Sequence, residues 1–402
     1  MLEGFLTSSE GSSLYFFGAG NVLRVDRATD LRVLDTFLND NKNAYLFVTL
    51  SYDLKNQMEQ LESRLIDFTE YPDLVCWNAP YVVEIHSDFS FTFLQGKRDH
   101  YSEHKVHETI SKLKSEPAML PTLNFRSRIS KTEYIQNIQQ IQQEIQQGNV
   151  YEMNFCQDFF ADDVPSFDPW DLFKRQYTLT KAPFSAFFQM DEFRVFCGSP
   201  ERFLQKTGDE LISQPIKGTI RRGKDALEDQ ELKTRLLNDP KERSENVMIV
   251  DLVRNDLSRI AAKNSVKVDE LFGVHTFETV HHLISTISCK VKPDTSFSSI
   301  LKATFPMGSM TGAPKISAMQ LTEKMESFKR GLYSGSIGYF KPNGDFDFNV
   351  VIRSFVQNLK TNRISCAVGS AITNQAVAES EYDECMVKVR KMVQLFGDDQ
   401  RF

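Results

Sequence analysis

The chain has 402 residues, of which 41% are hydrophobic and 25% charged, a balance typical of a soluble globular protein with a sizeable core. The formal net charge is −7 and there is no long basic run, which argues against nucleic-acid binding, and no segment is apolar enough for a membrane span. The opening MLEGFLTSSEGSSLYFFGAG lacks a signal-peptide pattern, and the six cysteines are scattered, so we expect reduced thiols in a cytoplasmic protein.

The first part of the chain, residues 1–120, has a β-rich pattern. Alternating apolar residues predict strands at Ala44–Leu54 and Ser90–Gly96. Lys97–Pro121 is charged and polar, and it predicts a surface loop or a domain joint. At about 150 residues per domain, the length allows two or three domains or one interleaved unit.

A helix is predicted from Ser130, because Ser130 and Glu133 form a capping box and isoleucines recur at helical spacing up to Gly148. The alternating stretch Val150–Ala161 predicts a strand. Two neighbouring strands are then predicted, one at Arg194–Gln205 and one at Glu210–Ile220.

The last part of the chain begins with a helix after Asp239, where Asp is a suitable N-cap and Pro follows at the first turn. Residues 335–373 predict three strands with turns at Asn343–Gly344 and Thr361–Asn362, and a final helix covers Glu379–Phe396. Since strands come mostly in hairpins rather than βα units, we favour an α+β fold with antiparallel sheets.

Charged residues of the last helix are the first candidates for chemistry. Glu381, Glu384 and Lys388 share one helix face, which is either a solvated surface or, with Glu245, a site for Mg²⁺. Gly, Ser and Thr in Phe305–Lys315 form either a structural turn or an anion-binding turn, without the P-loop pattern.

Three basic residues leave two readings each. His281 and His282 are adjacent, and neighbours on a helix point in different directions, so His282 is either a hydrogen-bonded core residue or catalytic. Arg353, in an apolar strand, either bridges a protein carboxylate or clamps a ligand carboxylate. Lys217 is either a surface charge or a desolvated nucleophile with a lowered pKa.

Eight motifs occur together in the order found in the chorismate-utilising enzymes, and the chain strongly resembles that family from about residue 120 to 395. The family includes anthranilate synthase component I, aminodeoxychorismate synthase component I, isochorismate synthase and salicylate synthase. The motifs are SPERF, PIKGT, ENVMIVDLVRNDL, VHHLIST, FPMGSMTGAPK, YSGSIGY, IRSF and ESEYDE.

The resemblance implies a fold of two β-sheets packed as a sandwich with helices outside. It also implies that residues 1–120 are woven into one unit with a chorismate-binding catalytic region, residues 121–402. Aminodeoxychorismate synthases carry PIKGT where anthranilate synthases usually carry PIAGT, so Lys217 points to the former. In that branch the lysine attacks C2 of chorismate and the C4 hydroxyl leaves; ammonia then attacks C4 and expels the lysine from C2.

The same resemblance assigns roles to the remaining site residues. Glu201 is the general acid, and His282 and Ser309 lie near C4 of the ring. The Mg²⁺ ligands are Glu245 and Glu384, with Glu242 and Glu381 close by. The predicted substrate-binding residues are Tyr333, Arg353, Gly369, Ser370, Lys388, Gly218 and Thr219.

Two departures from the family pattern stand out. Ile220–Arg221 replaces the usual Arg-Pro after PIKGT, which we expect to shift that loop. Glu152 stands where water-adding relatives have a lysine base, which argues against isochorismate or salicylate formation. With neither a glutaminase nor a lyase domain evident, we expect ammonia from solution or a separate glutamine amidotransferase subunit. The alternatives are anthranilate synthase component I and a non-catalytic relative that binds chorismate or a partner.

Overall fold

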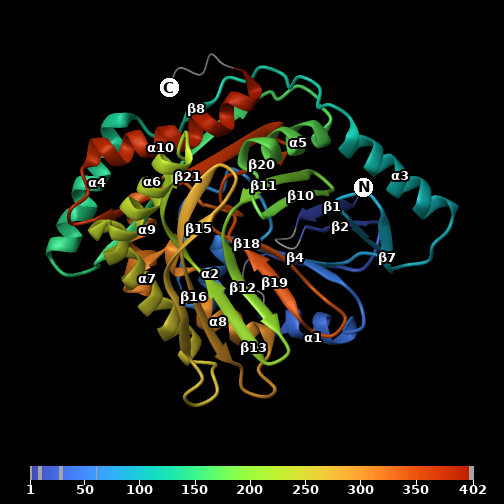
Figure 1. Ribbon diagram of the computed structural model, residues 1–402, viewed down its shortest axis with the longest axis horizontal. Helices are drawn as coiled ribbons and strands as arrows, with labels where there is room; N and C mark the ends of the chain where they lie inside the picture. Colours follow the sequence, from blue (N-terminus) through green and yellow to red (C-terminus); the bar gives the residue numbers. More distant parts are fainter. Residues whose placement is uncertain (1, 8–10, 27–29, 60, 398–402) are drawn as a thin grey trace.

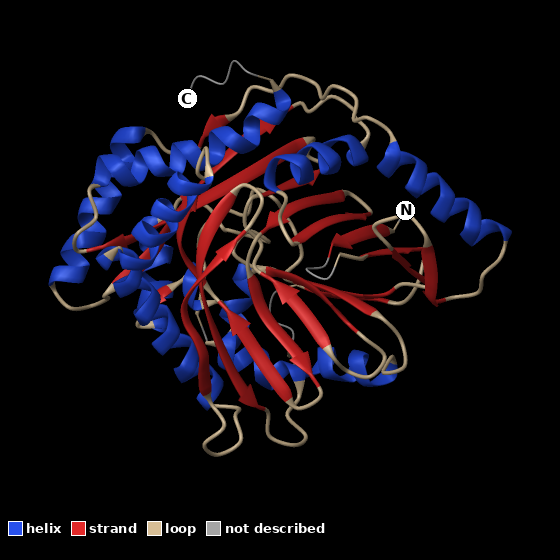
Figure 2. Cartoon of the chain, in the orientation of Figure 1, coloured by secondary structure: helices blue, strands red, loops and turns tan. Residues whose placement is uncertain are grey.

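The computed structural model of the protein describes residues 2–7, 11–26, 30–59 and 61–397. Within these residues, two antiparallel β-sheets pack face to face and most helices lie on the outside (Figures 1 and 2). The predicted α+β class, with two packed sheets, is therefore confirmed. No helix in the described ranges has both the length and the apolar character needed to cross a bilayer.

Both sheets draw strands from the two ends of the chain. The first runs in the order β17 (Gly312–Ala313), β9 (Glu152–Asp162), β21 (Arg363–Thr373), β20 (Ser354–Asn358), β11 (Phe193–Ser199), β10 (Phe184–Met190), β1 (Glu3–Thr7), β2 (Ser13–Phe17), β6 (Tyr81–Ile85) and β7 (Phe91–Gln95), with β8 (Arg126–Ser127) beside β9. The second runs in the order β14 (Ile216–Arg221), β16 (Val280–Lys290), β13 (Glu210–Gln214), β12 (Arg202–Thr207), β19 (Phe346–Asn349), β18 (Ser336–Phe340), β4 (Leu46–Leu50), β5 (Leu74–Asn78) and β3 (Val22–Val25), with β15 (Lys267–Thr276) beside β16.

The helices cover the outer faces of the sheets (Figure 2). They are α1 (Arg32–Asp40), α2 (Lys55–Met58), α3 (His100–Lys114), α4 (Lys131–Gln146), α5 (Pro169–Thr180), α6 (Ala226–Asn238), α7 (Pro240–Ser258), α8 (Phe297–Thr304), α9 (Lys315–Met325) and α10 (Ala378–Val393), with 3₁₀ turns η1 (Tyr52–Leu54), η2 (Gly308–Met310) and η3 (Gln394–Phe396). The capping box of α4 forms as predicted, since Ser130 and Glu133 bond each other's backbone N–H groups.

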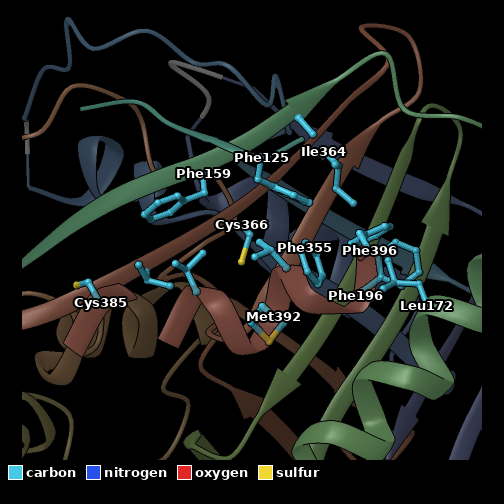
Figure 3. Close-up of a cluster of buried hydrophobic side chains, with 14 of the residues drawn as sticks. Phe125, Phe159, Leu172, Phe196, Phe355, Ile364, Cys366, Cys385, Met392 and Phe396 are labelled. Atoms are coloured by element: carbon cyan, nitrogen blue, oxygen red, sulfur yellow. The ribbon is translucent and has the colours of Figure 1, made fainter. Parts of the chain in front are cut away.

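Aromatic rings fill the space between the sheets. Phe16 of the first sheet stacks on Phe47 of the second, with ring centroids 3.4 Å apart, and Trp77 and Phe188 pack beside them. A second cluster lies between the first sheet and its helices, where Phe125, Phe355 and Phe396 meet (Figure 3). All six cysteines are buried and free, as expected from their spacing.

The prediction of a surface loop at Lys97–Pro121 is wrong, because residues 100–114 form α3, whereas the alternative of a domain joint stays a prediction. Asp99 and Ser102 make a reciprocal capping box, and the helix buries Val106 and Ile110. The buried face also includes polar residues, so its helical period is weak in the sequence.

Three predicted stretches of strand are interrupted in the structure: Arg194–Gln205, Glu210–Ile220 and residues 335–373. The chain leaves β11 at Ser199 and enters the other sheet at Arg202, and Pro215 separates β13 from β14. Residues 335–373 form four strands rather than three, because residues 350–353 carry the chain from β19 in one sheet to β20 in the other. Arg353, the residue directly before β20, has a positive φ of 51°, which lies outside the β region.

Candidate active site

A pocket of about 500 Å³ is lined by residues of α7, α10, β14, β16 and β21. It collects side chains from segments spread over more than two hundred positions of sequence. Every residue that the sequence assigned to the site lines this pocket: Glu201, Lys217, Gly218, Thr219, Glu242, Glu245, His282, Ser309, Tyr333, Arg353, Gly369, Ser370, Glu381, Glu384 and Lys388. Their individual roles stay predictions.

The strand that carries Lys217 is shaped by a glycine. The pairing of β14 with β16 shifts register between Ile216 and Thr219, and Gly218 inside this irregularity has a φ of 96°. A Cβ at Gly218 would approach Glu242 Oε2 to 3.2 Å and Leu283 to 3.3 Å. Glycine is therefore suited to position 218 in two ways: it adopts the positive φ, and it has no Cβ to collide with these neighbours. Both features help to bring Lys217 to the pocket.

Lys217 lies between acidic side chains, and 11% of its side chain is exposed. Its Nζ lies 2.7 Å from Glu152 Oε1 and 3.5 Å from Glu245 Oε2. Burial alone would lower the pKa of this amine, but Glu152 and Glu245 outweigh burial and hold the pKa above its ordinary value. The expected lowering of the Lys217 pKa is therefore wrong for the protein without ligands.

Glu201 lies at the crossing between the two sheets, 5% exposed. Ser309 Oγ donates a hydrogen bond of 2.8 Å to Glu201 Oε1. Burial raises the pKa of Glu201 to about 7, although the bond from Ser309, the backbone N–H of Ile216 and the charge of Lys217 oppose the rise. A carboxyl with this pKa is partly protonated near neutral pH, as a general acid requires.

Four carboxylates from two helices border the same pocket. Glu242 and Glu245 lie on α7, and Glu381 and Glu384 lie on α10. Burial raises the pKa of Glu245, and the charge of Glu152 adds to this rise while Lys217 opposes it. Ser370 Oγ donates to Glu381, and Lys388 pairs with Glu384 at 2.7 Å. At Glu384 burial acts to raise the pKa, but Lys388 outweighs it and the pKa is lowered.

The donor set suits a hard divalent cation. Within the described ranges, no three His, Cys, Asp or Glu side chains already converge as a metal cluster. Mg²⁺, however, commonly takes only one or two protein carboxylates and keeps several waters. Glu245 Oε1 is buried without a hydrogen-bond donor among the described residues, so one ligand atom is left for a cation. Glu245 and Glu384, with Glu242 and Glu381 beside them, therefore fit the predicted Mg²⁺ site.

The other end of the pocket is basic. The Arg353 guanidinium makes no hydrogen bond or ion pair to any described residue, and burial lowers its pKa. The sequence left open whether Arg353 pairs with a protein carboxylate or with a ligand carboxylate. No pair with a protein carboxylate forms among the described residues. Tyr333 and the backbone of Gly369 lie nearby, and a Cβ at Gly369 would come within 3.3 Å of the Tyr333 hydroxyl. Since a buried cation needs a counter-charge, this end of the pocket fits an anionic ligand group.

His282 lies on a strand, not a helix. His281 and His282 are neighbours in β16, so their side chains point to opposite faces. His281 bonds Asp229 at 2.9 Å, whereas His282 lines the pocket and bonds Thr219 Oγ1 through Nδ1 at 2.8 Å. Burial, with a smaller effect from Arg353, lowers the pKa of His282 to about 4, so its ring is neutral near pH 7.

Two charged residues at the site were not singled out as functional from the sequence. Lys241 of α7 is half-exposed, and its Nζ lies 3.5 Å from Glu381 Oε1 and 3.9 Å from Glu245 Oε1. Glu152 contacts Lys217, although the sequence treated it only as a departure from the family pattern. The position of Lys241 next to Glu242 could have indicated it from the sequence. The contact between Glu152 and Lys217 could not be found in this way, because it joins strands of different sheets.

Comparison with known proteins agrees with this geometry. The model of the chorismate binding enzyme family matches residues 10–394. Aminodeoxychorismate synthase component 1 of Escherichia coli is 38% identical over 272 residues, 68% of this chain and 59% of that protein. The chain thus spans less than two thirds of that relative's length. The protein of the same name from Bacillus subtilis is 31% identical over 359 residues, 85% of this chain and 75% of that protein.

Solved structures share the fold. Anthranilate synthase component I of Streptococcus pneumoniae superposes with a TM-score of 0.81 at 24% identity, covering 95% of this chain and 92% of that one. At this identity the similarity establishes the architecture of two packed sheets.

Proposed function

The chain belongs to the chorismate binding enzyme family, and we propose that it aminates chorismate to 4-amino-4-deoxychorismate, which leads to p-aminobenzoate and folate. One observation carries the proposal. The amine of Lys217 lies inside the pocket, together with Glu201 and the carboxylates of α7 and α10. The names of the Escherichia coli and Bacillus subtilis relatives support the same activity.

The charges of the pocket match a dianionic substrate. Arg353 and Tyr333, with the backbone near Gly369 and Ser370, would bind the enolpyruvyl carboxylate. Glu245 and Glu384 would hold Mg²⁺, which when bound would supply the positive charge that neutralises the ring carboxylate. Lys388, bonded to Glu384 and to the Gly369 carbonyl at 3.0 Å, connects the two ends of the site.

The reaction proceeds in two displacements. Lys217 first passes its extra proton to one of the two carboxylates beside it. Its nitrogen then bonds to C2 of the ring, the two conjugated ring double bonds shift, and the C4–O bond breaks. Glu201 gives its proton to the departing hydroxyl, which leaves as water. Ammonia next attacks C4, both ring double bonds shift back, the C2–N bond to Lys217 breaks, and the lysine nitrogen regains a proton.

His282 and Ser309 are the residues proposed to lie near C4, and Thr219 bonds His282. Because the ring of His282 is neutral at pH 7, it adds a hydrogen-bonding group without adding a charge. A neutral imidazole at this position does not protonate ammonia, and ammonia attacks only in its unprotonated form.

A glutamine amidotransferase partner would supply the ammonia. The designation component 1 of the relatives supports a second component. We expect the isolated chain to use ammonium salts and to fail with glutamine, and addition of an amidotransferase subunit to restore glutamine use. Full use of glutamine by the chain alone would exclude the partner.

Product identification tests the proposed activity. The chain is incubated with chorismate, Mg²⁺ and an ammonium salt, with and without a lyase that removes pyruvate from 4-amino-4-deoxychorismate. We expect 4-amino-4-deoxychorismate without the lyase and p-aminobenzoate with it. Fluorescent anthranilate formed without the lyase would instead assign the chain to the anthranilate branch. Chorismate binding without turnover would indicate a non-catalytic relative.

A further inference from the structure

Glu152 is a buried carboxylate that lies behind Lys217, outside the set of residues that line the pocket. It is 1% exposed and starts β9, where its backbone is fixed on both sides by pairing with Thr373 of β21 and Ala313 of β17. One oxygen, Oε1, accepts from Lys217, and the other, Oε2, is buried without a donor among the described residues. The position of this carboxylate is therefore set by the first sheet and not by the pocket.

The Lys217 ammonium lies between two carboxylates of different kinds. Its 2.7 Å bond to Glu152 has the length of a strong charge-assisted hydrogen bond, whereas the 3.5 Å separation from Glu245 is a looser ion pair. Glu245 is also one of the carboxylates that fit Mg²⁺. A lysine and a divalent cation thus compete for the charge of Glu245, and Glu152 draws the lysine to the other side.

We propose that Glu152 is a positioning residue that holds the Lys217 amine apart from the metal-binding carboxylates, so that nucleophile and cation occupy one pocket. This inference rests on the proposed Mg²⁺ site. Without Glu152, the nearest counter-charge of the Lys217 ammonium is Glu245. The ammonium then moves onto Glu245 and opposes Mg²⁺ binding, and the same movement withdraws the nitrogen from the ring.

The test is a magnesium titration by calorimetry on the ligand-free chain. We expect Glu152→Ala to weaken Mg²⁺ binding by roughly 10- to 100-fold, the range found when groups behind metal ligands are removed. Glu152→Gln keeps an oxygen that accepts from Lys217. We therefore expect its Mg²⁺ affinity to lie between that of the unmodified chain and that of Glu152→Ala. Removing the competing amine in Glu152→Ala/Lys217→Ala returns the affinity to that of the unmodified chain or above it.

A matched control separates this effect from the general cost of breaking a buried ion pair. Glu323 pairs with buried Lys55 at 2.9 Å and likewise has one buried oxygen without a donor among the described residues, but it does not line the pocket. Glu323→Ala should lower the melting temperature and leave Mg²⁺ affinity unchanged.

Turnover gives a second readout. In Glu152→Ala the magnesium concentration for half-maximal turnover should rise, and saturating magnesium should recover part of the rate. A merely structural role would lower turnover at every magnesium concentration alike.

Two results would overturn the inference: Glu152→Ala binding Mg²⁺ as tightly as the unmodified chain, or the double variant binding as weakly as Glu152→Ala alone. If the unmodified chain binds no Mg²⁺, the proposed metal site fails first, and that outcome is distinct from the other two.

Discussion

At the level of single residues, the properties of the site depend on neighbours that are remote in the sequence. The motif around Lys217 indicated an amine in a cleft, and the structure places it there. The direction of its pKa shift could not be predicted, because the deciding charges, Glu152 and Glu245, come from β9 and α7. Glu201 is simpler, because burial alone accounts for the rise of its pKa.

Ser309→Ala should move the pH dependence of turnover to higher pH. Glu201 must be protonated to donate, so turnover falls as pH rises through its pKa of about 7. The Ser309 hydrogen bond favours the ionised form of Glu201, and its loss raises that pKa further. The measurement is kcat with ammonium as the nitrogen source across the neutral range. Ser299→Ala on the exposed side of α8 serves as the control, and an unmoved or lowered pH limit would contradict this role of Ser309.

At the level of elements, the capping residues in the sequence located two helix starts better than alternation located strand ends. The helices after Ser130 and Asp239 begin at their predicted caps, because capping is a local interaction. The strand interruptions near Glu201 and Arg353 occur where the chain passes from one sheet to the other. Alternation of apolar residues predicts a strand, but it does not indicate the sheet that the strand joins. These interruptions place functional side chains in the pocket.

Gly218→Ala should damage the site through β14. A non-glycine residue at a φ of 96° is strained, and its Cβ would crowd Glu242 and Leu283, so we expect a loss of about 1–3 kcal/mol in stability and a large loss of turnover. Gly208→Ala is the control, because Gly208 also has a positive φ, of 60°, but has open space around it. Thermal unfolding and kcat measure the two effects. Equal turnover in both variants would show that the shape of β14 does not position Lys217.

Lys241→Met should tighten magnesium binding, because α7 places this ammonium between Glu245 and Glu381, where it offsets their charge. Since Lys241 is half-exposed and screened by solvent, we expect a gain of about two- to fivefold in affinity. Calorimetric titration measures it, with Lys391→Met on the exposed side of α10 as the control. Weaker binding in Lys241→Met would show that Lys241 supports the site rather than competing with the cation.

At the level of the whole molecule, both sheets combine strands from the two ends of the chain. β1, β2, β6 and β7 complete the first sheet, and β3, β4 and β5 complete the second. The resemblance of motifs predicted two packed sheets, and composition alone could not, because pairing between distant strands leaves no local signal. The division of the chain at residue 120 stays a prediction.

Lys55→Ala should destabilise the whole molecule. Lys55 is fully buried and pairs with Glu323, and nearby Asp53 accepts from the Gly331 backbone N–H at 2.9 Å, so these contacts join the start of the chain to its second half. Removing one partner of a buried pair costs about 3–5 kcal/mol, and we expect one cooperative unfolding transition at a lower temperature. Arg98→Ala breaks an exposed pair with Glu103 and should cost less than about 1 kcal/mol. Two separate transitions would mean that the two parts unfold independently.

The central claim is that Lys217 forms a covalent bond to the ring, and peptide mass spectrometry tests it most directly. The chain is incubated with chorismate and Mg²⁺ without ammonia, digested and analysed. We predict that the peptide containing Lys217 gains the mass of chorismate less one water, that ammonium discharges this adduct, and that Lys217→Ala binds chorismate without forming it. Undiminished amination by Lys217→Ala, with no adduct on the unmodified chain, would contradict the account.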